Sequence, residues 1–446
     1  MSTDSFFGFK NVGVLGASGK MGRGIVLLLA KKILFQNLKY SRKQKIFAFD
    51  LSIDSLIEMV NYIEFQSIKY SEKNIILLRE MYSGRSELFN DTDFVQAYLK
   101  DMKELVFVSD NIDSVQDCEL IFEAVAEDIE IKSNLLSAID KKSKVKPYYF
   151  TNTSSIPISV LEKKSGIEGR VIGLHFYNPP PVQKLLEIIK TEKTELELIK
   201  LADDIAELLN KTVVYAPDCA GFIGNGQFLR EVSFALSLAS ELSKDYGIDK
   251  AIYTINQTTK ILLLRPMGIF EVVDYVGINV CDAIMTVMQS AFPSEKFNNS
   301  LLKAWIEAGV LGGQDTKGKT KNGIFKYESG QINGVFNGVE YSAVEPLSFE
   351  GVQTLLWKDL KSDKSIESTL NKYFSDLQKC NNSLVELAIT YGKACCSIGE
   401  QLVVQKIAFS KKDVNKIMTL GFHHLYGPVN VFFESYRIKD RIGDDE

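Results

Sequence analysis

Apolar and polar positions in the first half of the chain follow the pattern of strands separated by helices. An apolar strand over residues 12–15 leads into a glycine-rich turn, an apolar helix and a second strand over residues 45–50, and a helical stretch rich in Lys and Glu fills residues 51–104. Further short apolar runs predict strands at residues 106–108, 120–125, 147–150, 170–176, 182–189 and 213–215. This alternation predicts an α/β domain with a Rossmann-type doubly wound sheet.

From residue 217 the pattern becomes helical almost to the end of the chain. Two similar motifs each follow a helical run, and they read Arg265-Pro266-Met267-Gly268-Ile269-Phe270-Glu271 and Leu425-Tyr426-Gly427-Pro428-Val429-Asn430-Val431-Phe432-Phe433-Glu434. They predict two all-α helical domains, the second a diverged copy of the first. Residues 312–345 are rich in Gly, Lys and Asn, which favours a linker or surface loops. The expected domains are residues 1–216, 217–335 and 336–446.

Composition narrows the class of protein. A net charge of −5 argues against a nucleic-acid binder, because binding to the phosphate backbone needs clustered Lys and Arg. The six cysteines lack the paired spacing of a zinc site, so we expect no metal and a reducing cytoplasm. The N-terminal residues do not form a signal peptide pattern, and no apolar run approaches the ~20 residues that a membrane span needs.

The glycine-rich turn after the first strand predicts a dinucleotide site. Glycines stand at Gly16, Gly19 and Gly22, where a strand ends and a helix begins, and such a turn lets the backbone approach a pyrophosphate. Asp50 ends the next strand, where a carboxylate binds the adenosine ribose and repels a 2′-phosphate, so we expect NAD. The alternatives are a tight turn without a ligand and an aspartate that caps the next helix.

His175 is the candidate catalytic base. The chain has three histidines, and the other two, His423 and His424, are adjacent and distant in sequence. His175 ends a predicted strand and Glu187 follows a proline turn, so two strands folded back on each other could set the carboxylate against the imidazole. Such an acid fixes the tautomer and stabilises the imidazolium. A lone histidine at a strand end can equally be structural.

The surrounding motifs resemble the 3-hydroxyacyl-CoA dehydrogenase family. The residues that carry the resemblance are Phe122-Glu123-Ala124-Val125-Ala126-Glu127, Thr151-Asn152-Thr153-Ser154-Ser155-Ile156-Pro157, Gly173-Leu174-His175-Phe176-Tyr177-Asn178-Pro179, Lys184-Leu185-Leu186-Glu187, Asp218-Cys219-Ala220-Gly221-Phe222-Ile223-Gly224-Asn225 and Pro266-Met267-Gly268-Ile269-Phe270-Glu271. The final hundred residues resemble the second helical copy that some members carry. The glycine turn departs from the family pattern because it holds one extra residue.

The resemblance implies an NAD-dependent enzyme that oxidises (S)-3-hydroxyacyl-CoA to 3-ketoacyl-CoA in fatty-acid metabolism. It implies that His175 is the base, paired with Glu187, that Ser154 lies near the substrate oxygen, and that Asn225 steadies the substrate. The cofactor positions implied are Gly16, Gly19, Met21, Gly22, Asp50, Glu127, Lys132 and Asn178. Lys319, with Thr320, resembles the segment near the CoA end, and the alternative there is a solvated loop.

Other interpretations stay open at this stage. The chain could be a non-catalytic family member that serves as a structural protein or a subunit of a complex, or a dehydrogenase of a 3-hydroxy acid or sugar acid without CoA. A second helical copy within one chain predicts a monomer that is a pseudo-dimer, with a homodimer as the alternative. Association with an enoyl-CoA hydratase or a thiolase is also an expectation.

Overall fold

The apolar runs of the first half of the chain form one eight-stranded sheet in the computed structural model, which describes residues 6–297, 299–315 and 318–433. The strands are β1 Asn11–Leu15, β2 Lys45–Phe49, β3 Val106–Ser109, β4 Leu120–Glu123, β5 Tyr148–Thr151, β6 Val171–Phe176, β7 Leu185–Ile189 and β8 Thr212–Ala216. Their order across the sheet is β3-β2-β1-β4-β5-β6-β7-β8. The first six run parallel, and β7 runs antiparallel to β6. Such an order places a ligand crevice at the carboxyl ends of β1 and β4, where the strand order reverses.

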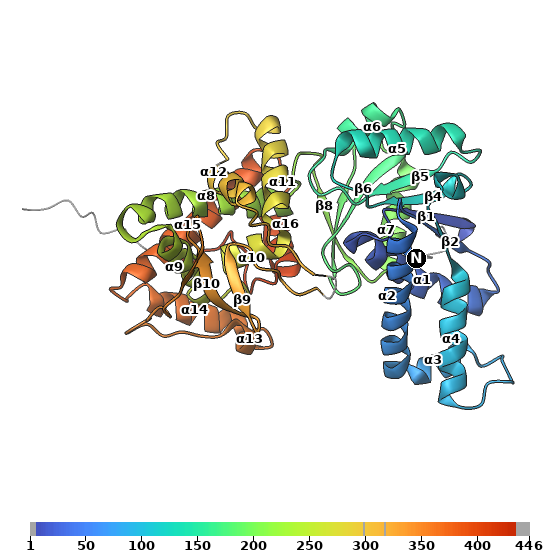
Figure 1. Ribbon diagram of the computed structural model, residues 1–446, viewed down its shortest axis with the longest axis horizontal. Helices are drawn as coiled ribbons and strands as arrows, with labels where there is room; N and C mark the ends of the chain where they lie inside the picture. Colours follow the sequence, from blue (N-terminus) through green and yellow to red (C-terminus); the bar gives the residue numbers. More distant parts are fainter. Residues whose placement is uncertain (1–5, 298, 316–317, 434–446) are drawn as a thin grey trace, which may run out of the picture. The chain divides into compact units, whose positions relative to one another are not determined.

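Helices cover both faces of this sheet (Figure 1). Their bounds are α1 Lys20–Tyr40, α2 Ile53–Lys73, α3 Ile75–Met81, α4 Asp91–Leu105, α5 Ile129–Lys142, α6 Ile158–Ser165 and α7 Leu196–Leu208, with short 3₁₀ turns at Phe6–Gly8 and Ile112–Val115. Helices α1, α4 and α7 share one apolar core with the sheet, while α6 packs on the opposite face, where Ile158 lies against Gly173. Figure 1 shows α2 and α4 side by side, with α3 between them at one end.

Burial explains why these segments become central strands. Every residue of β4, β6 and β7 is buried, which is the pattern of a sheet with helices on both faces. Helix α1 starts directly after the glycine turn and buries Ile25, Val26 and Leu29 against the sheet. The tight strand–turn–helix connection therefore rests on an apolar helix face, and the turn itself stays at the surface at Gly19.

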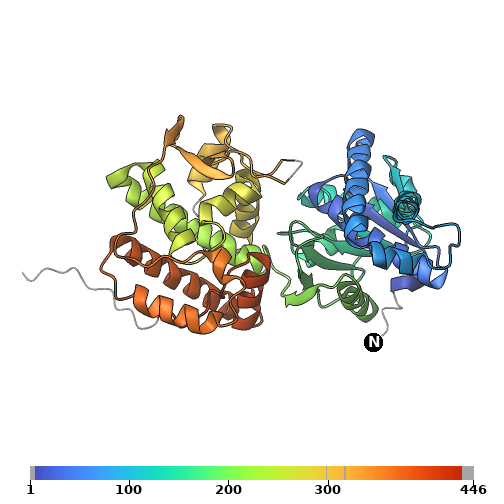
Figure 2. The same ribbon diagram turned by 90° about the horizontal axis from the view of Figure 1, so that it is seen from below.

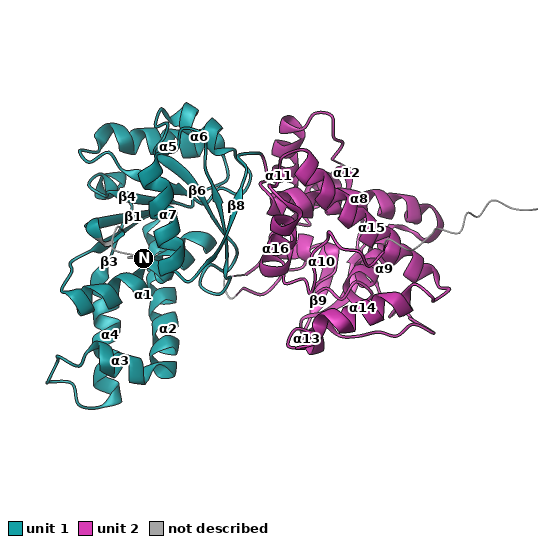
Figure 3. Cartoon of the chain, turned by 180° about the vertical axis from the view of Figure 1, so that it is seen from behind, with its two compact units in different colours: residues 1–219 teal, residues 220–446 magenta. Residues whose placement is uncertain are grey.

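The chain divides into two compact units, residues 1–219 and 220–446 (Figure 3). The sequence placed a boundary after residue 216, close to this division. The further boundary at 335/336 stays a prediction, as does a second copy of the helical domain. Glu434 and the rest of the predicted 336–446 domain beyond Phe433 lie outside the described residues.

The second unit is mainly helical. Its helices are α8 Gly224–Tyr246, α9 Ile248–Ile261, α10 Ile269–Val276, α11 Ile278–Ala291, α12 Ser300–Glu307, α13 Trp357–Leu360, α14 Ile366–Leu377, α15 Ser383–Val404 and α16 Lys411–Gly421. Figure 2 shows α14, α15 and α16 in orange to red as neighbouring helices. Helix α15 also packs along α8 and α9, and one apolar core joins residues from Ala220 to Phe433.

The segment expected to be a linker or loops instead contains a small antiparallel sheet. Its strands are β9 Phe325–Glu328, β10 Gln331–Phe336 and β11 Tyr341–Ala343, in the order β11-β10-β9. Phe325 and Val335 are fully buried, so the apolar residues among the glycines face the helical core. The predicted fold class, a Rossmann-type sheet domain followed by helical structure, is confirmed. The small sheet of β9, β10 and β11 was not predicted, because the composition of this segment favours loops.

Candidate active site

In the glycine turn between β1 and α1, backbone atoms lie too close to Gly16 and Gly22 to leave room for a side chain. Gly16 adopts a φ of +70°, and a Cβ on it would lie 2.5 Å from the carbonyl oxygen of Ala124. A Cβ on Gly22 would overlap the carbonyl oxygen of Gly16. Gly19 is the exposed N-cap of α1, so the positive end of a 21-residue helix meets solvent there without a side chain. This cradle fits the pyrophosphate of a dinucleotide, with Met21 in the first turn.

Asp50 lies one residue beyond β2. It accepts hydrogen bonds from Ser18, the residue that makes the glycine turn longer than the family pattern. Ser18 donates two hydrogen bonds to Oδ2 of Asp50, from its backbone N–H at 3.0 Å and from its hydroxyl at 2.5 Å. Leu51 donates its N–H to Oδ1 at 2.8 Å. Three hydrogen bonds from the protein therefore orient the Asp50 carboxylate. Sequence reasoning assigned no role to Ser18, although the extra residue in the turn was the signal for it.

A buried ion pair lies under the carboxyl ends of β4 and β5. Lys132, at 1% side-chain exposure, places Nζ 2.7 Å from Oε1 of Glu123, which is fully buried, and 3.3 Å from Oε2 of Glu127. Glu123 also accepts the hydroxyl of Thr151 at 2.6 Å and the N–H of Val125 at 2.8 Å. Sequence reasoning included Glu123 in a motif and gave it no function. Lys132 therefore lies inside the protein as a cation between two carboxylates.

Glu127 organises the loop that carries Ser154. Its Oε1 accepts the backbone N–H of Ser154 at 2.8 Å, the N–H and hydroxyl of Ser155 at 2.8 Å each, and the hydroxyl of Thr153 at 2.7 Å. Burial acts to raise the pKa of Glu127, but the Lys132 cation and these donors outweigh it and hold the pKa below its ordinary value. Glu127 is thus an anion that fixes the backbone on both sides of Ser154, a half-buried residue at the carboxyl end of β5.

His175 and Glu187 face each other across the antiparallel pair β6 and β7. The register pairs the two residues directly, and Nδ1 of His175 lies 2.7 Å from Oε2 of Glu187. The Glu187 side chain is fully buried, whereas 11% of the His175 side chain is exposed. The phenol of Tyr177 donates to the same Oε2 at 2.9 Å. The sequence predicted the first contact from the proline turn, and Tyr177 is a residue that it missed.

The proline turn after His175 is held from two sides. Asn178 precedes the cis-linked Pro179, and Nζ of Lys211 donates to the carbonyl oxygens of Pro180 at 2.6 Å and Gln183 at 2.5 Å. Burial lowers the pKa of Lys211 to about 8. On the other side, a Cβ on Gly24 of α1 would lie 2.9 Å from Pro180. The turn therefore packs on the helix that begins at the cofactor cradle.

The two remaining predicted residues belong to the second unit. Asn225 is half-buried in the first turn of α8. Lys319 is exposed, and its backbone N–H donates to Oδ1 of Asp315 at 2.8 Å. The predicted residues of the first unit instead gather at one edge of its sheet, because β1, β4, β5 and β6 are parallel and end there. This edge can bind a dinucleotide and can accept a proton at an oriented imidazole.

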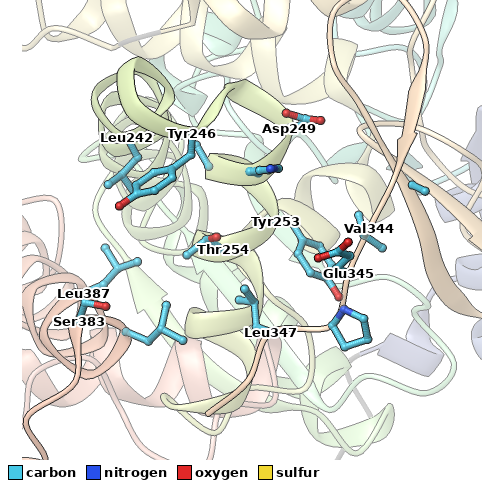
Figure 4. A pocket seen from close by; sticks show the side chains of 15 residues that line it. Leu242, Tyr246, Asp249, Tyr253, Thr254, Val344, Glu345, Leu347, Ser383 and Leu387 are labelled. Atoms are coloured by element: carbon cyan, nitrogen blue, oxygen red, sulfur yellow. The ribbon is translucent and has the colours of Figure 1, made fainter. Parts of the chain in front are cut away.

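The second unit also contains a cavity of about 520 Å³ (Figure 4). It is lined by side chains from the end of α8, from α9, from the segment after β11 and from the start of α15, among them Tyr246, Tyr253, Thr254, Glu345 and Leu387. None of the sequence-predicted site residues is among its lining residues. The cavity is therefore separate from the residues that the sequence predicts for alcohol oxidation.

The described parts of the chain hold neither a metal-ligand cluster nor a membrane-spanning helix. In residues 6–297, 299–315 and 318–433, no three His, Cys, Asp or Glu side chains are grouped so as to hold a metal ion. Over the same residues, each helix is too short or too polar to cross a membrane.

Comparisons with known proteins identify the first unit as an NAD binding domain. Residues 11–219 match the NAD binding domain of 3-hydroxyacyl-CoA dehydrogenase, and residues 221–322 match its C-terminal domain. A probable 3-hydroxybutyryl-CoA dehydrogenase of Deinococcus radiodurans is 32% identical over 213 residues, which are 47% of this chain and 72% of that protein. A probable 3-hydroxyacyl-CoA dehydrogenase of Caenorhabditis elegans is 28% identical over 321 residues, or 72% and 96% of the two chains.

A solved structure extends the likeness of the fold. The crystal structure of 3-hydroxybutyryl-CoA dehydrogenase from Escherichia coli K12 superposes with a TM-score of 0.62 at 20% identity, covering 94% of this chain and 90% of that one. At this identity the likeness concerns the fold alone. It spans both units, including the residues after 322.

Proposed function

Because the chain belongs to the 3-hydroxyacyl-CoA dehydrogenase family, we propose that it oxidises (S)-3-hydroxyacyl-CoA to 3-ketoacyl-CoA with NAD, using His175 as general base. The observation that supports this role most directly is the 2.7 Å contact between Nδ1 of His175 and the buried carboxylate of Glu187. A carboxylate on Nδ1 keeps the proton of a neutral imidazole on that nitrogen, which leaves Nε2 to act as the acceptor.

The protein supplies placement and a proton acceptor for this reaction. Bound NAD would accept the hydride from carbon three of the substrate. As the carbon–hydrogen bond breaks, the hydroxyl proton passes to Nε2 of His175, and the oxygen forms the ketone. Glu187 stabilises the resulting imidazolium because its negative charge lies against Nδ1 in a buried position. In the reverse direction, the imidazolium returns the proton to the oxygen.

The remaining predicted residues have supporting roles in this proposal. Gly16, Gly19, Met21 and Gly22 form the pyrophosphate cradle, and Asp50 binds the adenosine ribose. Glu127 and Asn178 line the nicotinamide side, and Glu127 fixes the loop of Ser154 near the substrate oxygen. Lys132, predicted to bind the cofactor, has a buried side chain and instead supports Glu127 from inside the protein. Asn225 steadies the substrate and Lys319 lies toward the CoA end. Each of these roles is a prediction for mutagenesis.

The metabolic setting is a further part of the proposal. Relatives include a glyoxysomal fatty acid beta-oxidation multifunctional protein of Cucumis sativus, 30% identical over 208 residues. We propose that this chain acts in fatty-acid breakdown in the cytoplasm, where an enoyl-CoA hydratase would supply its substrate and a thiolase would consume its product. A second helical copy over residues 336–446 would make the chain a monomeric pseudo-dimer.

The decisive experiment follows NADH formation from NAD with 3-hydroxyacyl-CoA substrates of several chain lengths. The wild-type protein should form NADH, and His175→Gln should reduce kcat by about 10²- to 10⁴-fold, the usual contribution of a general base. His423→Gln is the matched control and should retain activity. Free 3-hydroxybutyrate, tested against its CoA thioester, decides whether CoA is required. NAD binding without turnover of any substrate would support a non-catalytic family member instead.

A further inference from the structure

Tyr177 and His175 bind the same oxygen atom. The Tyr177 phenol donates to Oε2 of Glu187 at 2.9 Å, and Nδ1 of His175 lies 2.7 Å from that atom. The two rings are tilted by 44°, with centroids 5.0 Å apart. Tyr177 follows β6 directly, so His175 and Tyr177, two residues apart in the chain, both bind the carboxylate of Glu187. Neither the family resemblance nor the sequence pattern assigned Tyr177 a function.

The shared oxygen couples the two donors. A hydrogen bond from a phenol stabilises the carboxylate and draws negative charge toward the O–H group. Less charge is then left to stabilise a proton on the imidazole. Burial and the neighbouring carboxylate raise the pKa of Tyr177 well above 10, so the phenol keeps its proton and stays a donor throughout the neutral range.

We propose that Tyr177 is a positioning residue that lowers the proton affinity of His175 by binding Oε2 of Glu187. The proposal rests on the function proposed above, since it concerns the base of that reaction. Its consequence is a base that remains neutral, and therefore ready to accept a proton, at a lower pH than a His–Glu pair alone would allow. Tyr177 does not itself take up or release a proton.

Other ionisable groups packed around β6 have partners of their own. Glu162 of α6 accepts the hydroxyl of Thr191 at 3.0 Å, and Tyr149 of β5 donates to Asp140 at 3.3 Å. Further such groups on the flanking elements include Tyr148 with Glu195 and Glu197, Asp203 of α7 with Tyr215, and Lys211 with the proline turn. Glu187 and Tyr177 are ionisable groups that contact His175 directly.

The test uses Tyr177→Phe, which removes one oxygen and keeps the ring. The variant should raise the pKa that governs the acidic limb of kcat/KM for oxidation by about half to one pH unit. At a pH below that limb, oxidation should fall about 3- to 10-fold, while the plateau at high pH stays unchanged. Reduction needs the imidazolium, so its alkaline limb should move upward and its rate there should rise. A merely structural loss would lower both reactions at every pH.

Tyr215→Phe is the matched control. Its phenol also donates to a carboxylate, Asp203, at 2.7 Å, but it lies on the edge strand β8. Its profile should coincide with that of the wild type. An unchanged or lowered pKa in Tyr177→Phe would overturn the proposal and leave the dehydrogenase function standing.

A second readout is independent of turnover. NMR titration of the ring signals reports the pKa of each of the three histidines, and the signal lost in His175→Gln assigns the base. Tyr177→Phe should raise the His175 pKa in the wild-type background and leave it unchanged in Glu187→Gln, because the coupling passes through the carboxylate. The same shift in both backgrounds would overturn the proposal even if no substrate of the enzyme were found.

Discussion

Ser18 donates both its backbone N–H and its hydroxyl to one oxygen of Asp50, at 3.0 and 2.5 Å. Ser18 belongs to the lengthened glycine turn, and Asp50 is the acid placed to bind the adenosine ribose. The extra residue of the turn therefore has its partner within the proposed cofactor site. It orients the carboxylate in advance, which reduces the ordering that NAD binding requires.

We expect Ser18→Ala to weaken NAD binding about 3- to 10-fold, because it removes one hydrogen bond to a charged group and leaves the Asp50 carboxylate held by two backbone N–H groups alone. Titration of NADH fluorescence or calorimetry measures the change. Ser240→Ala, which removes a hydroxyl bonded only locally to Leu236 in α8, is the control and should bind NAD as the wild type does. Equal affinity for Ser18→Ala would mean that Asp50 needs no support from the turn.

Lys132→Met should destabilise the first unit by about 3 to 5 kcal/mol, since it leaves the buried Glu123 carboxylate without its cation. Lys142→Met on the same helix is the control, because the Lys142–Asp113 pair is exposed and contributes at most about 1 kcal/mol. Both tryptophans, Trp305 and Trp357, lie in the second unit, so far-UV circular dichroism rather than fluorescence should follow this unfolding.

The destabilisation caused by Lys132→Met should depend on pH in a definite direction. Burial acts against the Lys132 cation, but the two carboxylates outweigh it and raise its pKa, while the pKa of Glu127 is lowered. A lowered carboxyl pKa contributes stability above the unfolded value of about 4.3, and a raised lysine pKa contributes it below about 10.4. The difference between wild type and Lys132→Met should therefore be largest between these values and shrink as the pH falls through the folded pKa of Glu127.

Asp274 gives the free energy of unfolding of the second unit the opposite dependence on pH. Burial raises its pKa to about 7, although the N–H groups of Ile324 and Phe325 and the phenol of Tyr327 act to lower it. The unfolded carboxyl ionises near pH 4, so between pH 4 and 7 the unfolded state binds fewer protons and the free energy of unfolding falls with rising pH. The fall should reach about 4 kcal/mol, measured by urea unfolding followed through tryptophan fluorescence.

Asp274→Asn should flatten this slope, whereas Asp359→Asn, at an exposed position, should keep it. A slope that survives in Asp274→Asn would mean that a group other than Asp274 causes it. A wild-type protein without the slope would mean that the three donors keep the Asp274 carboxylate ionised in spite of its burial.

The sequence predicted the elements of the site better than their contacts. The strand before His175 and the proline turn before Glu187 are local patterns, and together they predicted a pairing that the register confirms. Lys132 was placed near the cofactor, but its pairing with Glu123 depends on the packing of α5 beneath β4, which no local pattern encodes. The small sheet was missed for a related reason, because the apolar Phe325 and Val335 stand among glycines and polar residues that favour loops.

Substitutions in the glycine turn can separate an effect on folding from an effect on cofactor binding, because Gly19 and Gly22 have different neighbours. A Cβ on Gly22 would overlap the backbone oxygen of Gly16, and no rotamer change can relieve that clash. A Cβ on Gly19 would lie 3.3 Å from the same oxygen, and Gly19 has a φ of −62°, which alanine adopts readily. Gly84 has open space around it and serves as the control.

We therefore expect Gly22→Ala to lower the melting temperature and abolish NAD binding, even though alanine favours a helix over glycine by about 1 kcal/mol. Gly19→Ala should melt within a few degrees of the wild type yet bind NAD at least about tenfold more weakly, since its methyl group would occupy the surface where the helix start meets the pyrophosphate. Thermal melts and NADH titrations of the three variants give both quantities. Undiminished NAD affinity in Gly19→Ala would place the pyrophosphate elsewhere, because only a ligand seated on that helix start would feel a methyl group that the fold itself tolerates.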